Sequence, residues 1–322
     1  MVHLRHSWAL LLPILAALLG LPLIGQQAAA PSGQSPRPQG VRPSPASVPA
    51  SGPAGDFIIA TYNINYGNPN LQAVAEAVEQ SKADLIAFQE TNAASEKYLR
   101  ERLGGTYPHM VFRHAAAAGG FGFASKSPLR NTVWLPPKHG WFGTWVTEVR
   151  LGGAWVQVAN VHLIPVNIRA KAGPKALLAA VAKVSQIQTR EITRVEAALS
   201  GKVPAIILGD MNSPEDVSAP GYLVSRGFID SLAAAKKDPA DRTTWRWRRG
   251  RLQWRYRLDY IFHSPALSTR DSRVIPTEGS DHFLVVSTLG LSMQKPTDAA
   301  EAREAAAVTS RPADSPAEAT SP

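Results

Sequence analysis

Several short apolar segments of the chain end in polar residues whose side chains carry oxygen or imidazole nitrogen atoms. These residues are Asn63, Glu90, His162, Asp210 and Asn212. A strand that ends in such a residue presents it at the rim of its sheet, where several segments can build one site. Carboxylate and amide oxygens are the ligands that Mg²⁺, Mn²⁺ and Ca²⁺ prefer, in contrast to thiophilic metals. The pattern therefore indicates the binding of a hard cation or a phosphate.

Two further clusters add to this set. Asp259 lies in the sequence RLDYIF at 257–262, and Asp281 and His282 lie in GSDH at 279–282. Each of these residues means little alone, because a strand-end Asp or Asn is most often a turn or cap residue. A single His is more often hydrogen-bonded or at the surface than catalytic. It is the ordered set of eight residues that indicates a function.

The segments that must position these residues alternate between strand and helix patterns. Residues 145–149 and 155–159 alternate around Leu151-Gly152-Gly153, which predicts a hairpin. Strands are also predicted at 57–62, 84–88, 203–208, 257–262 and 283–289, and amphipathic helices at 71–80 and 175–199. Strands that are in part paired as hairpins and in part separated by helices predict an α/β fold with a mixed sheet core flanked by helices.

The two ends of the chain differ in composition from its middle. Residues 1–30 combine a basic start, an almost unbroken apolar run and three consecutive alanines, which predicts an export signal; an uncleaved membrane anchor is the alternative. Residues 31–55 are a linker rich in Pro, Ser, Ala and Gly, and residues 293–322 are expected to be a disordered polar tail. One catalytic domain is expected at 56–292. The protein is thus predicted to be periplasmic, extracellular, or anchored to the membrane by its apolar segment.

The basic charge of the chain belongs to the predicted domain. The 322 residues carry a formal charge of +9, and residues 56–292 hold 28 basic and 20 acidic residues. This balance favours an anionic partner, although charge alone does not determine a reaction. The chain has no cysteine, which excludes disulfides, thiolate metal ligands and a cysteine nucleophile. A composition of 44% hydrophobic and 18% charged residues excludes a wholly disordered chain and a multi-pass membrane protein.

Six motifs resemble, in order, those of the endonuclease/exonuclease/phosphatase superfamily, the DNase I-like group. They are TYNIN at 61–65, QE at 89–90, NVHL at 160–163, LGDMN at 208–212, RLDYIF at 257–262 and GSDH at 279–282. The group also contains exonuclease III, neutral sphingomyelinases and inositol-polyphosphate 5-phosphatases. The resemblance covers residues 57–291 and implies a four-layer α/β sandwich, in which two packed mixed sheets lie between helices and the site lies at one edge.

The resemblance also implies metal-dependent hydrolysis of a phosphoester, usually with Mg²⁺, while Mn²⁺ and Ca²⁺ are alternatives. It implies that Glu90 is the principal metal ligand, that Asn63 lies close by, and that Asp281 helps to hold the metal or its water. Because a carboxylate beside a divalent cation keeps a low pKa, Glu90 is expected to be ionised. Asn65 stands where some DNA-repair members have an acidic residue, which argues against a second metal site there.

The remaining implied roles concern water and phosphate. Asp210 would orient and deprotonate the attacking water, and Asn212 would bind the phosphate. Asp259 would fix the ring of His282, and His162 and His282 would contact the non-bridging oxygens or assist the leaving group. An Asp–His pair defines the tautomer of the ring and stabilises the imidazolium, which suits contact with phosphate.

An arginine-rich segment directly precedes Asp259. Residues 242–257 contain seven arginines and no acidic residue, and four aromatic residues alternate with them: Trp245, Trp247, Trp254 and Tyr256. The alternation predicts a β-hairpin whose aromatic face belongs to the core; exposed aromatics that stack on bases are the alternative. The arginine face is expected to bind substrate phosphate, although a merely solvated face would show the same pattern. The residues assigned to this role are Arg246, Arg248, Arg251 and Arg255.

The leading hypothesis is a monomeric, exported, divalent-metal-dependent nuclease that hydrolyses phosphodiester bonds of DNA or RNA. The runner-up is a phosphatase or phospholipase C-like hydrolase of the same superfamily, acting on a membrane lipid or a phosphorylated small molecule. The loop at 134–143 has an aromatic tip, Trp141-Phe142, that could touch a membrane, but packing is its main expected role. A non-catalytic anion- or membrane-binding module is the third hypothesis, and the complete set of eight polar residues argues against it.

Overall fold

The computed structural model describes residues 55–68, 70–166, 173–249 and 252–292. The predicted export signal, almost all of the predicted linker and the predicted tail lie outside these residues, so those three predictions stay predictions. Within the described ranges, no helix combines the length and the apolar character needed to cross a membrane.

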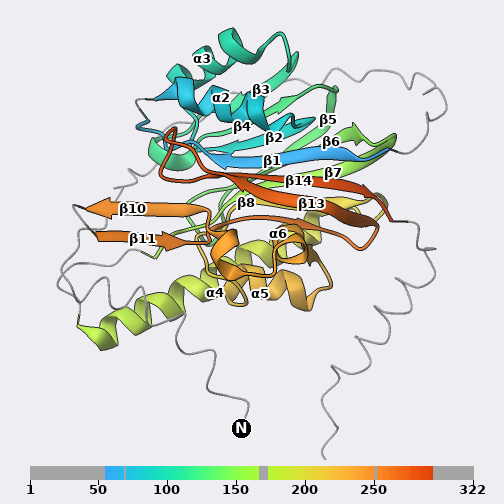
Figure 1. Ribbon diagram of the computed structural model, residues 1–322. Coiled ribbons are helices and arrows are strands. Elements are labelled where there is room, and N and C mark those ends of the chain that lie inside the picture. The colour runs from blue at the N-terminus through green and yellow to red at the C-terminus, as the bar shows by residue number, and fades with distance from the viewer. Residues whose placement is uncertain (1–54, 69, 167–172, 250–251, 293–322) are drawn as a thin grey trace, which may run out of the picture. The chain divides into compact units, whose positions relative to one another are not determined.

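Two six-stranded sheets form the centre of the folded unit (Figure 1). In the first sheet the order is β13 (Leu267–Ile275), β14 (Leu284–Leu291), β1 (Phe57–Asn63), β2 (Leu85–Gln89), β4 (Phe121–Ser125) and β3 (His109–Arg113). In the second sheet it is β5 (Leu129–Leu135), β6 (Thr144–Leu151), β7 (Ala154–His162), β8 (Ala205–Asp210), β12 (Asp259–His263) and β9 (Ile229–Asp230). Each sheet has one parallel pair, β1–β2 and β7–β8, among antiparallel neighbours, so both sheets are mixed.

Helices cover the outer faces of both sheets, except the short helix at Ser231–Ala235, whose Leu232 belongs to the cluster between the sheets. The helices are α2 (Leu71–Ser81), α3 (Ala93–Leu103), α4 (Pro174–Ala198), α5 (Ser218–Ser225) and α6 (Ser231–Ala235), with 3₁₀ turns η1 (Ala117–Gly119) and η2 (Pro239–Arg242). Val74 and Leu99 of α2 and α3 pack with Ile86 of the first sheet, while Ile192 and Leu223 of α4 and α5 belong to the cluster on the second.

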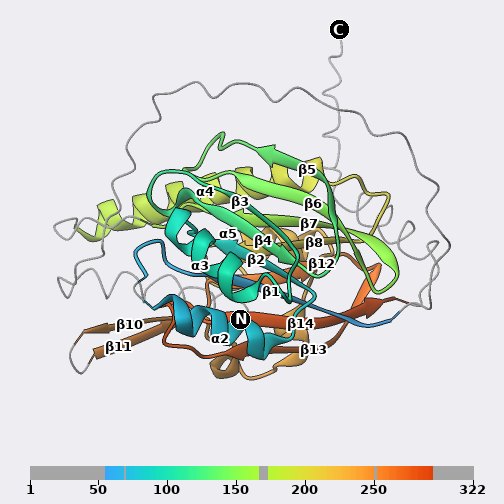
Figure 2. The ribbon, with the colours of Figure 1, turned by 90° about the horizontal axis from the view of Figure 1, so that it is seen from above.

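Between the sheets lies a third apolar cluster, with Ile59 and Ala87 from the first sheet and Val158 and Leu208 from the second. The order is thus helices, sheet, sheet, helices, which Figure 2 shows from above. The predicted four-layer α/β sandwich is confirmed.

The predicted elements coincide with observed ones, but several elements were not predicted. Helix α3 is an example: its sequence AASEKYLRERL buries only Ser95, Leu99 and Leu103, so its apolar stripe is narrow. Its start is fixed by a capping box in which the side chain of Asn92 accepts from Ser95 N and Ser95 Oγ accepts from Asn92 N. A short capped helix of this kind carries little periodic signal.

The predicted arginine-rich hairpin is observed as β10 (Trp245–Arg249) and β11 (Leu252–Tyr256), which form a separate two-stranded sheet. It projects beyond the ends of the large sheets in both views (Figures 1 and 2). Trp245 pairs with Tyr256 and Trp247 with Trp254, so the four aromatic residues share one face. Their side chains are half-buried and belong to none of the apolar clusters. The prediction that this face is core is therefore wrong, because the hairpin extends past the sheets that would have covered it.

Candidate active site

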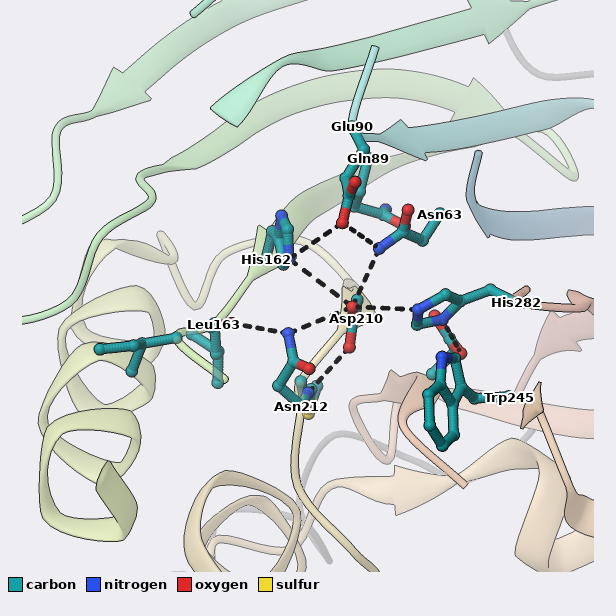
Figure 3. Close-up of polar contacts among 12 residues, drawn as sticks. Asn63, Gln89, Glu90, His162, Leu163, Asp210, Asn212, Trp245 and His282 are labelled. Atoms are coloured by element: carbon teal, nitrogen blue, oxygen red, sulfur yellow. Dashed lines mark hydrogen bonds and ion pairs between the residues drawn. The ribbon is translucent and has the colours of Figure 1, made fainter. Parts of the chain in front are cut away.

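The polar residues predicted from the sequence meet where the two sheets end (Figure 3). In each sheet the parallel pair brings two carboxyl-terminal strand ends together. Asn63 and Glu90 lie at the ends of β1 and β2, and His162 and Asp210 at the ends of β7 and β8. Strand β12 runs antiparallel to β8 and begins there, with Asp259 opposite Asp210.

Asp210 is the centre of the cluster. The amide Nδ2 of Asn63 donates to Asp210 Oδ2 and to Glu90 Oε1, each at 3.0 Å, and thereby joins the two sheets. Asn212 donates its backbone N–H to Asp210 Oδ1 at 2.8 Å and its side-chain Nδ2 to Oδ2 at 3.2 Å. The carboxylate is therefore held on both oxygens by neutral donors.

Unusual backbone conformations position these side chains. Glu90 and Asn212 have φ values of 61° and 47°, a left-handed region that side chains rarely adopt. Gly209 has φ 137°, and a Cβ there would lie 1.9 Å from the carbonyl oxygen of Val161 on the neighbouring strand. Backbone strain of this kind is typical of functional sites, where the surrounding structure must stabilise it.

His282 is held as a cation. Its Nδ1 donates to Asp259 Oδ2 at 2.9 Å, and its Nε2 lies 3.8 Å from Asp210 Oδ2. Burial lowers the pKa of His282, but the nearby carboxylates of Asp259 and Asp210 outweigh it and raise that pKa well above its ordinary value. Asp259 is itself fixed, because its backbone N–H donates to Thr244 Oγ1 at 3.0 Å.

His162 has the opposite protonation state. Its Nε2 lies 3.6 Å from Asp210 Oδ2 and 3.9 Å from Glu90 Oε1. Burial, together with the charge of His282, nevertheless lowers the pKa of His162 to about 3. These contacts are therefore made by a neutral imidazole and are not ion pairs. The ring of Phe142 stacks on it, with centroids 4.0 Å apart and an interplanar angle of 13°.

The acidic residues need a cation. Burial raises the pKa of Asp210 to about 7, although His282 lowers it, and burial also raises the pKa of Glu90. Two buried carboxylates in one cluster are costly to ionise unless a cation neutralises them. Asp259 Oδ1 is also buried and has no hydrogen-bond partner among the described residues. The donor set therefore fits a divalent cation, whose charge would keep Glu90 ionised as predicted.

Two groups of side chains could hold that cation. One consists of Asp210, Asp259 and His282, whose ligand atoms lie within 4.8 Å of one another. A protonated imidazole has no lone pair for a metal, so a cation in this group would require His282 to lose its proton. The oxygens of Asn63, Glu90 and Asp210 impose no such requirement, and oxygen ligands suit a hard cation.

Asp281 lies at the rim of the cluster, next to His282. Asn65 Nδ2 donates to its Oδ1 at 3.1 Å, and Trp245 Nε1 donates to its Oδ2 at 3.0 Å. Both carboxylate oxygens of Asp281 thus accept a hydrogen bond, as do both oxygens of Glu90, which accept from Asn63 Nδ2 and from Tyr66 N. Trp245 was not predicted as a site residue; no local pattern indicates a contact with a residue 36 positions away.

Glu191 of α4 is a second residue that the sequence did not indicate. One of its carboxylate oxygens, Oε1, accepts the backbone N–H groups of Lys138, His139 and Gly140. This carboxylate holds the loop that ends in Phe142, the ring stacked on His162. In the sequence, the feature that could have indicated this role is the position of Glu191 on the buried face of an amphipathic helix.

Among the four arginines predicted to bind phosphate, Arg246 is already paired with a carboxylate. Arg246 binds Glu278 through Nη1 and Nη2 at 2.7 and 2.5 Å, and its guanidinium lies 5.0 Å from the ring centroid of Phe283. Arg255 is exposed. The side chain of Arg248 and the whole of Arg251 lie outside the described residues.

Comparison with known proteins identifies the family to which the chain belongs. A model of the endonuclease/exonuclease/phosphatase family matches residues 60–282, whereas no curated protein sequence matches the chain. An endonuclease/exonuclease/phosphatase structure from Beutenbergia cavernae is similar with a TM-score of 0.58 and 19% identity, covering 74% of this chain and 72% of that one. TDP2 from C. elegans has a TM-score of 0.57 at 15% identity and coverages of 74% and 76%. D. rerio TDP2, in complex with a single-strand DNA product, has 0.55 at 17% and coverages of 73% and 98%. The chain belongs to the endonuclease/exonuclease/phosphatase family.

Proposed function

We propose that the protein is an exported, divalent-metal-dependent phosphoesterase that hydrolyses phosphodiester bonds of nucleic acid by attack of water. The observation that carries this proposal is the single cluster at the sheet ends, in which a neutral and a cationic histidine both lie within 4 Å of Asp210. In-line attack on phosphorus needs a positioned water, neutralised non-bridging oxygens and a stabilised leaving oxygen. In the cluster, Asp210 can position the water, and His282 and His162 can contact the phosphate oxygens.

The side chains divide this work according to their protonation states. Asp210, whose two oxygens are held by Asn212 and Asn63, can accept a proton from the attacking water. His282 as imidazolium can donate to a non-bridging oxygen, and Asp259 keeps its Nε2 directed toward the cluster. Asn212 Nδ2 donates to Asp210 Oδ2 and to the carbonyl oxygen of Leu163. The Asn212 side chain therefore lies against the carboxylate that would activate the water.

A divalent cation, when bound, supplies positive charge that neutralises phosphate oxygens and activates water. We assign Asn63 and Glu90 as the oxygen ligands, with Asp281 at the rim, and leave Asp210 to the attacking water. Addition of Mg²⁺ or Mn²⁺ should raise the melting temperature of the purified protein. Glu90→Gln should abolish that rise, whereas Asp259→Asn should retain it; the reverse result would move the cation to the group of Asp210, Asp259 and His282.

Nucleic acid is the proposed substrate because the predicted domain is basic, with 28 basic and 20 acidic residues, and because a structural neighbour is described in complex with a single-strand DNA product. Purified protein should be incubated with single- and double-stranded DNA and RNA, with Mg²⁺ and with a chelator. Cleavage should require the metal and should be lost in Asp210→Ala and His282→Ala. Cleavage of none of these substrates would refute the nuclease.

One observation favours a second candidate, a phospholipase C-like hydrolase. Trp141 is 38% exposed at the tip of its loop, directly beside Phe142, which stacks on His162. An exposed aromatic side chain next to the site suits contact with a lipid surface. Turnover of sphingomyelin or a phosphoinositide, without cleavage of nucleic acid, would select this candidate. Export remains part of the proposal through the apolar segment at residues 1–30, and N-terminal sequencing of the mature protein tests its cleavage.

A further inference from the structure

The hairpin of β10 and β11 is joined to the catalytic cluster by its aromatic face. Trp245 Nε1 donates to Asp281 Oδ2 at 3.0 Å, and Trp245 also forms an isolated bridge with His282. Figure 3 shows the indole of Trp245 beside the His282 ring. The next residue, Arg246, belongs to the other face and binds Glu278 and the carbonyl oxygen of Thr277. The aromatic face of the hairpin, and not its arginine face, therefore adjoins the catalytic cluster.

The aromatic face consists of two cross-strand pairs. Trp245 and Tyr256 lie nearest the site, with ring centroids 5.9 Å apart and an interplanar angle of 27°. Trp247 and Trp254 form the next pair outward, two residues along each strand. Two residues of a strand span roughly 6.6 Å, so successive bases of one extended strand can contact successive pairs. All four side chains are half-buried and belong to none of the three apolar clusters, and the Trp254 Nε1 and Tyr256 Oη atoms are buried without a hydrogen-bond partner among the described residues.

The charge of the hairpin fits a polyanion. Residues 242–257 contain seven arginines and no acidic residue. Arg242 and Arg257 pair with Glu215, Arg257 pairs also with Asp230, and Arg246 pairs with Glu278. Among the described side chains, Arg255 is exposed on the arginine face of the hairpin. Aromatic side chains combined with arginines are the combination that binds single-stranded nucleic acid, because every unpaired base offers a π-face.

From these contacts we infer that the aromatic face of Trp245, Trp247, Trp254 and Tyr256 binds unpaired bases of the substrate strand and leads that strand to the catalytic cluster. The inference rests on the proposed function and names its substrate class: nucleic acid with a single-stranded segment next to the cleaved bond. Bases inside a duplex are stacked on each other and do not present their faces to this surface. The enzyme should therefore prefer a single strand to a blunt duplex.

Binding is measured with the catalytically inactive Asp210→Asn protein, by fluorescence anisotropy of a labelled single-stranded 12-mer and of the corresponding blunt duplex. In that protein, Trp247→Ala with Trp254→Ala should raise the Kd for the single strand roughly fivefold to 150-fold, the range for loss of one stacked base. The Kd for the duplex should change less than twofold. When Trp247→Phe takes the place of Trp247→Ala in the double variant, most of the lost single-strand affinity should return, because a phenyl ring also stacks.

A matched control is Trp155→Ala. Trp155 is another half-buried tryptophan on a strand, but it lies near the start of β7, at the opposite end from His162, where Arg130 covers its ring. This variant should leave both Kd values unchanged. With Asp210 intact, Trp155→Ala should hydrolyse bis(4-nitrophenyl) phosphate at the wild-type rate. The Trp247/Trp254 double variant should show the wild-type rise in melting temperature with Mg²⁺, which shows that its cluster is intact.

An unchanged single-strand Kd in the double variant, or an equal loss for single strand and duplex, would overturn the inference. Loss of binding to sphingomyelin vesicles with unchanged oligonucleotide binding would also overturn it and would assign the face to a membrane. Failure of the proposed function is a different result: wild-type protein that cleaves no nucleic acid refutes the nuclease, even where the single-strand Kd depends on Trp247 and Trp254 as expected.

Discussion

Replacing Asp259 by asparagine tests how the cluster keeps two histidines in opposite protonation states. The side chain of Asp259 is buried, and its Oδ2 accepts from His282 Nδ1 at 2.9 Å. Asparagine has the same shape but no charge. After the substitution, the described carboxylate that remains within 4 Å of a His282 ring nitrogen is Asp210, 3.8 Å from Nε2. Burial lowers the pKa of His282, and with the charge of Asp259 removed less negative charge opposes that effect, so the pKa of His282 should fall.

The magnitude follows from the kind of hydrogen bond that is lost. A hydrogen bond to a charged group contributes about 1.5–3 kcal/mol and a neutral one about 0.5–1.5 kcal/mol. The imidazolium should thus lose about 1–1.5 kcal/mol, which lowers the pKa of His282 by about one unit. The amide can also present its N–H₂ to Nδ1 and impose the wrong tautomer, a change that has cost about 10⁴-fold in an Asp–His–Ser enzyme. We expect kcat to fall between about 10-fold and 10⁴-fold.

The effect on stability has a defined sign. The pKa of His282 is raised in the folded protein, so this residue stabilises the fold below the unfolded pKa of 6.5, and that contribution is lost as pH rises through the folded pKa. The loss of unfolding free energy in Asp259→Asn should therefore be largest at pH 5–6.5 and should shrink at higher pH.

The assays are urea unfolding across pH, turnover of bis(4-nitrophenyl) phosphate with Mg²⁺, and NMR titration of ¹³C-labelled histidine. The matched control is Asp230→Asn, which removes a carboxylate that binds the buried Arg257. The control should lose stability and keep kcat within about threefold. An unchanged pKa of His282 together with an unchanged kcat in Asp259→Asn would refute the role given to this pair.

Three further predictions concern positions around the site. Glu191→Gln should remove the negative charge that accepts from three backbone N–H groups, and should lower the free energy of unfolding in urea by about 1–3 kcal/mol. It should also lower kcat, because the loop that packs on His162 is held less firmly. An unchanged unfolding free energy together with an unchanged kcat would contradict this. Gly209→Ala should cost about 3 kcal/mol or more, because its Cβ would lie 1.9 Å from Val161 O at a φ of 137°; a wild-type urea midpoint would disprove it. Burial lowers the pKa of His263, so the unfolded chain takes up a proton first and stability should fall as pH drops below about 6.5. His263→Gln should flatten that fall in pH-dependent urea midpoints, and an identical slope would exclude His263 as its source.

The long elements and the polar residues at their ends could be predicted because the responsible signals are local. Apolar periodicity fixes which face of α4 is buried, and a strand such as 205–210 places its last residue, Asp210, at a sheet edge whatever its neighbours are. The order of the six motifs then indicated the family. Short elements such as α3 and β9 carry too little periodicity for a local prediction.

The hairpin shows where local patterns stop being sufficient. Its strands and its register follow from the alternation of aromatic residues and arginines. Which face meets the site depends on contacts with residues about 30 positions away, namely Trp245 with Asp281 and Arg246 with Glu278. The sequence therefore predicted the hairpin and assigned the wrong surroundings to its aromatic face.

What the sequence determined by itself is the set of chemical groups and the strands that end in them, since residue type and periodicity are properties of short segments. What only the tertiary structure decided is the electrostatic state of those groups. His162 and His282 have the same ordinary pKa, yet burial makes one neutral while two carboxylates from β8 and β12 make the other a cation. Desolvation and charge–charge interaction act through distances that exist only once the two sheets have met.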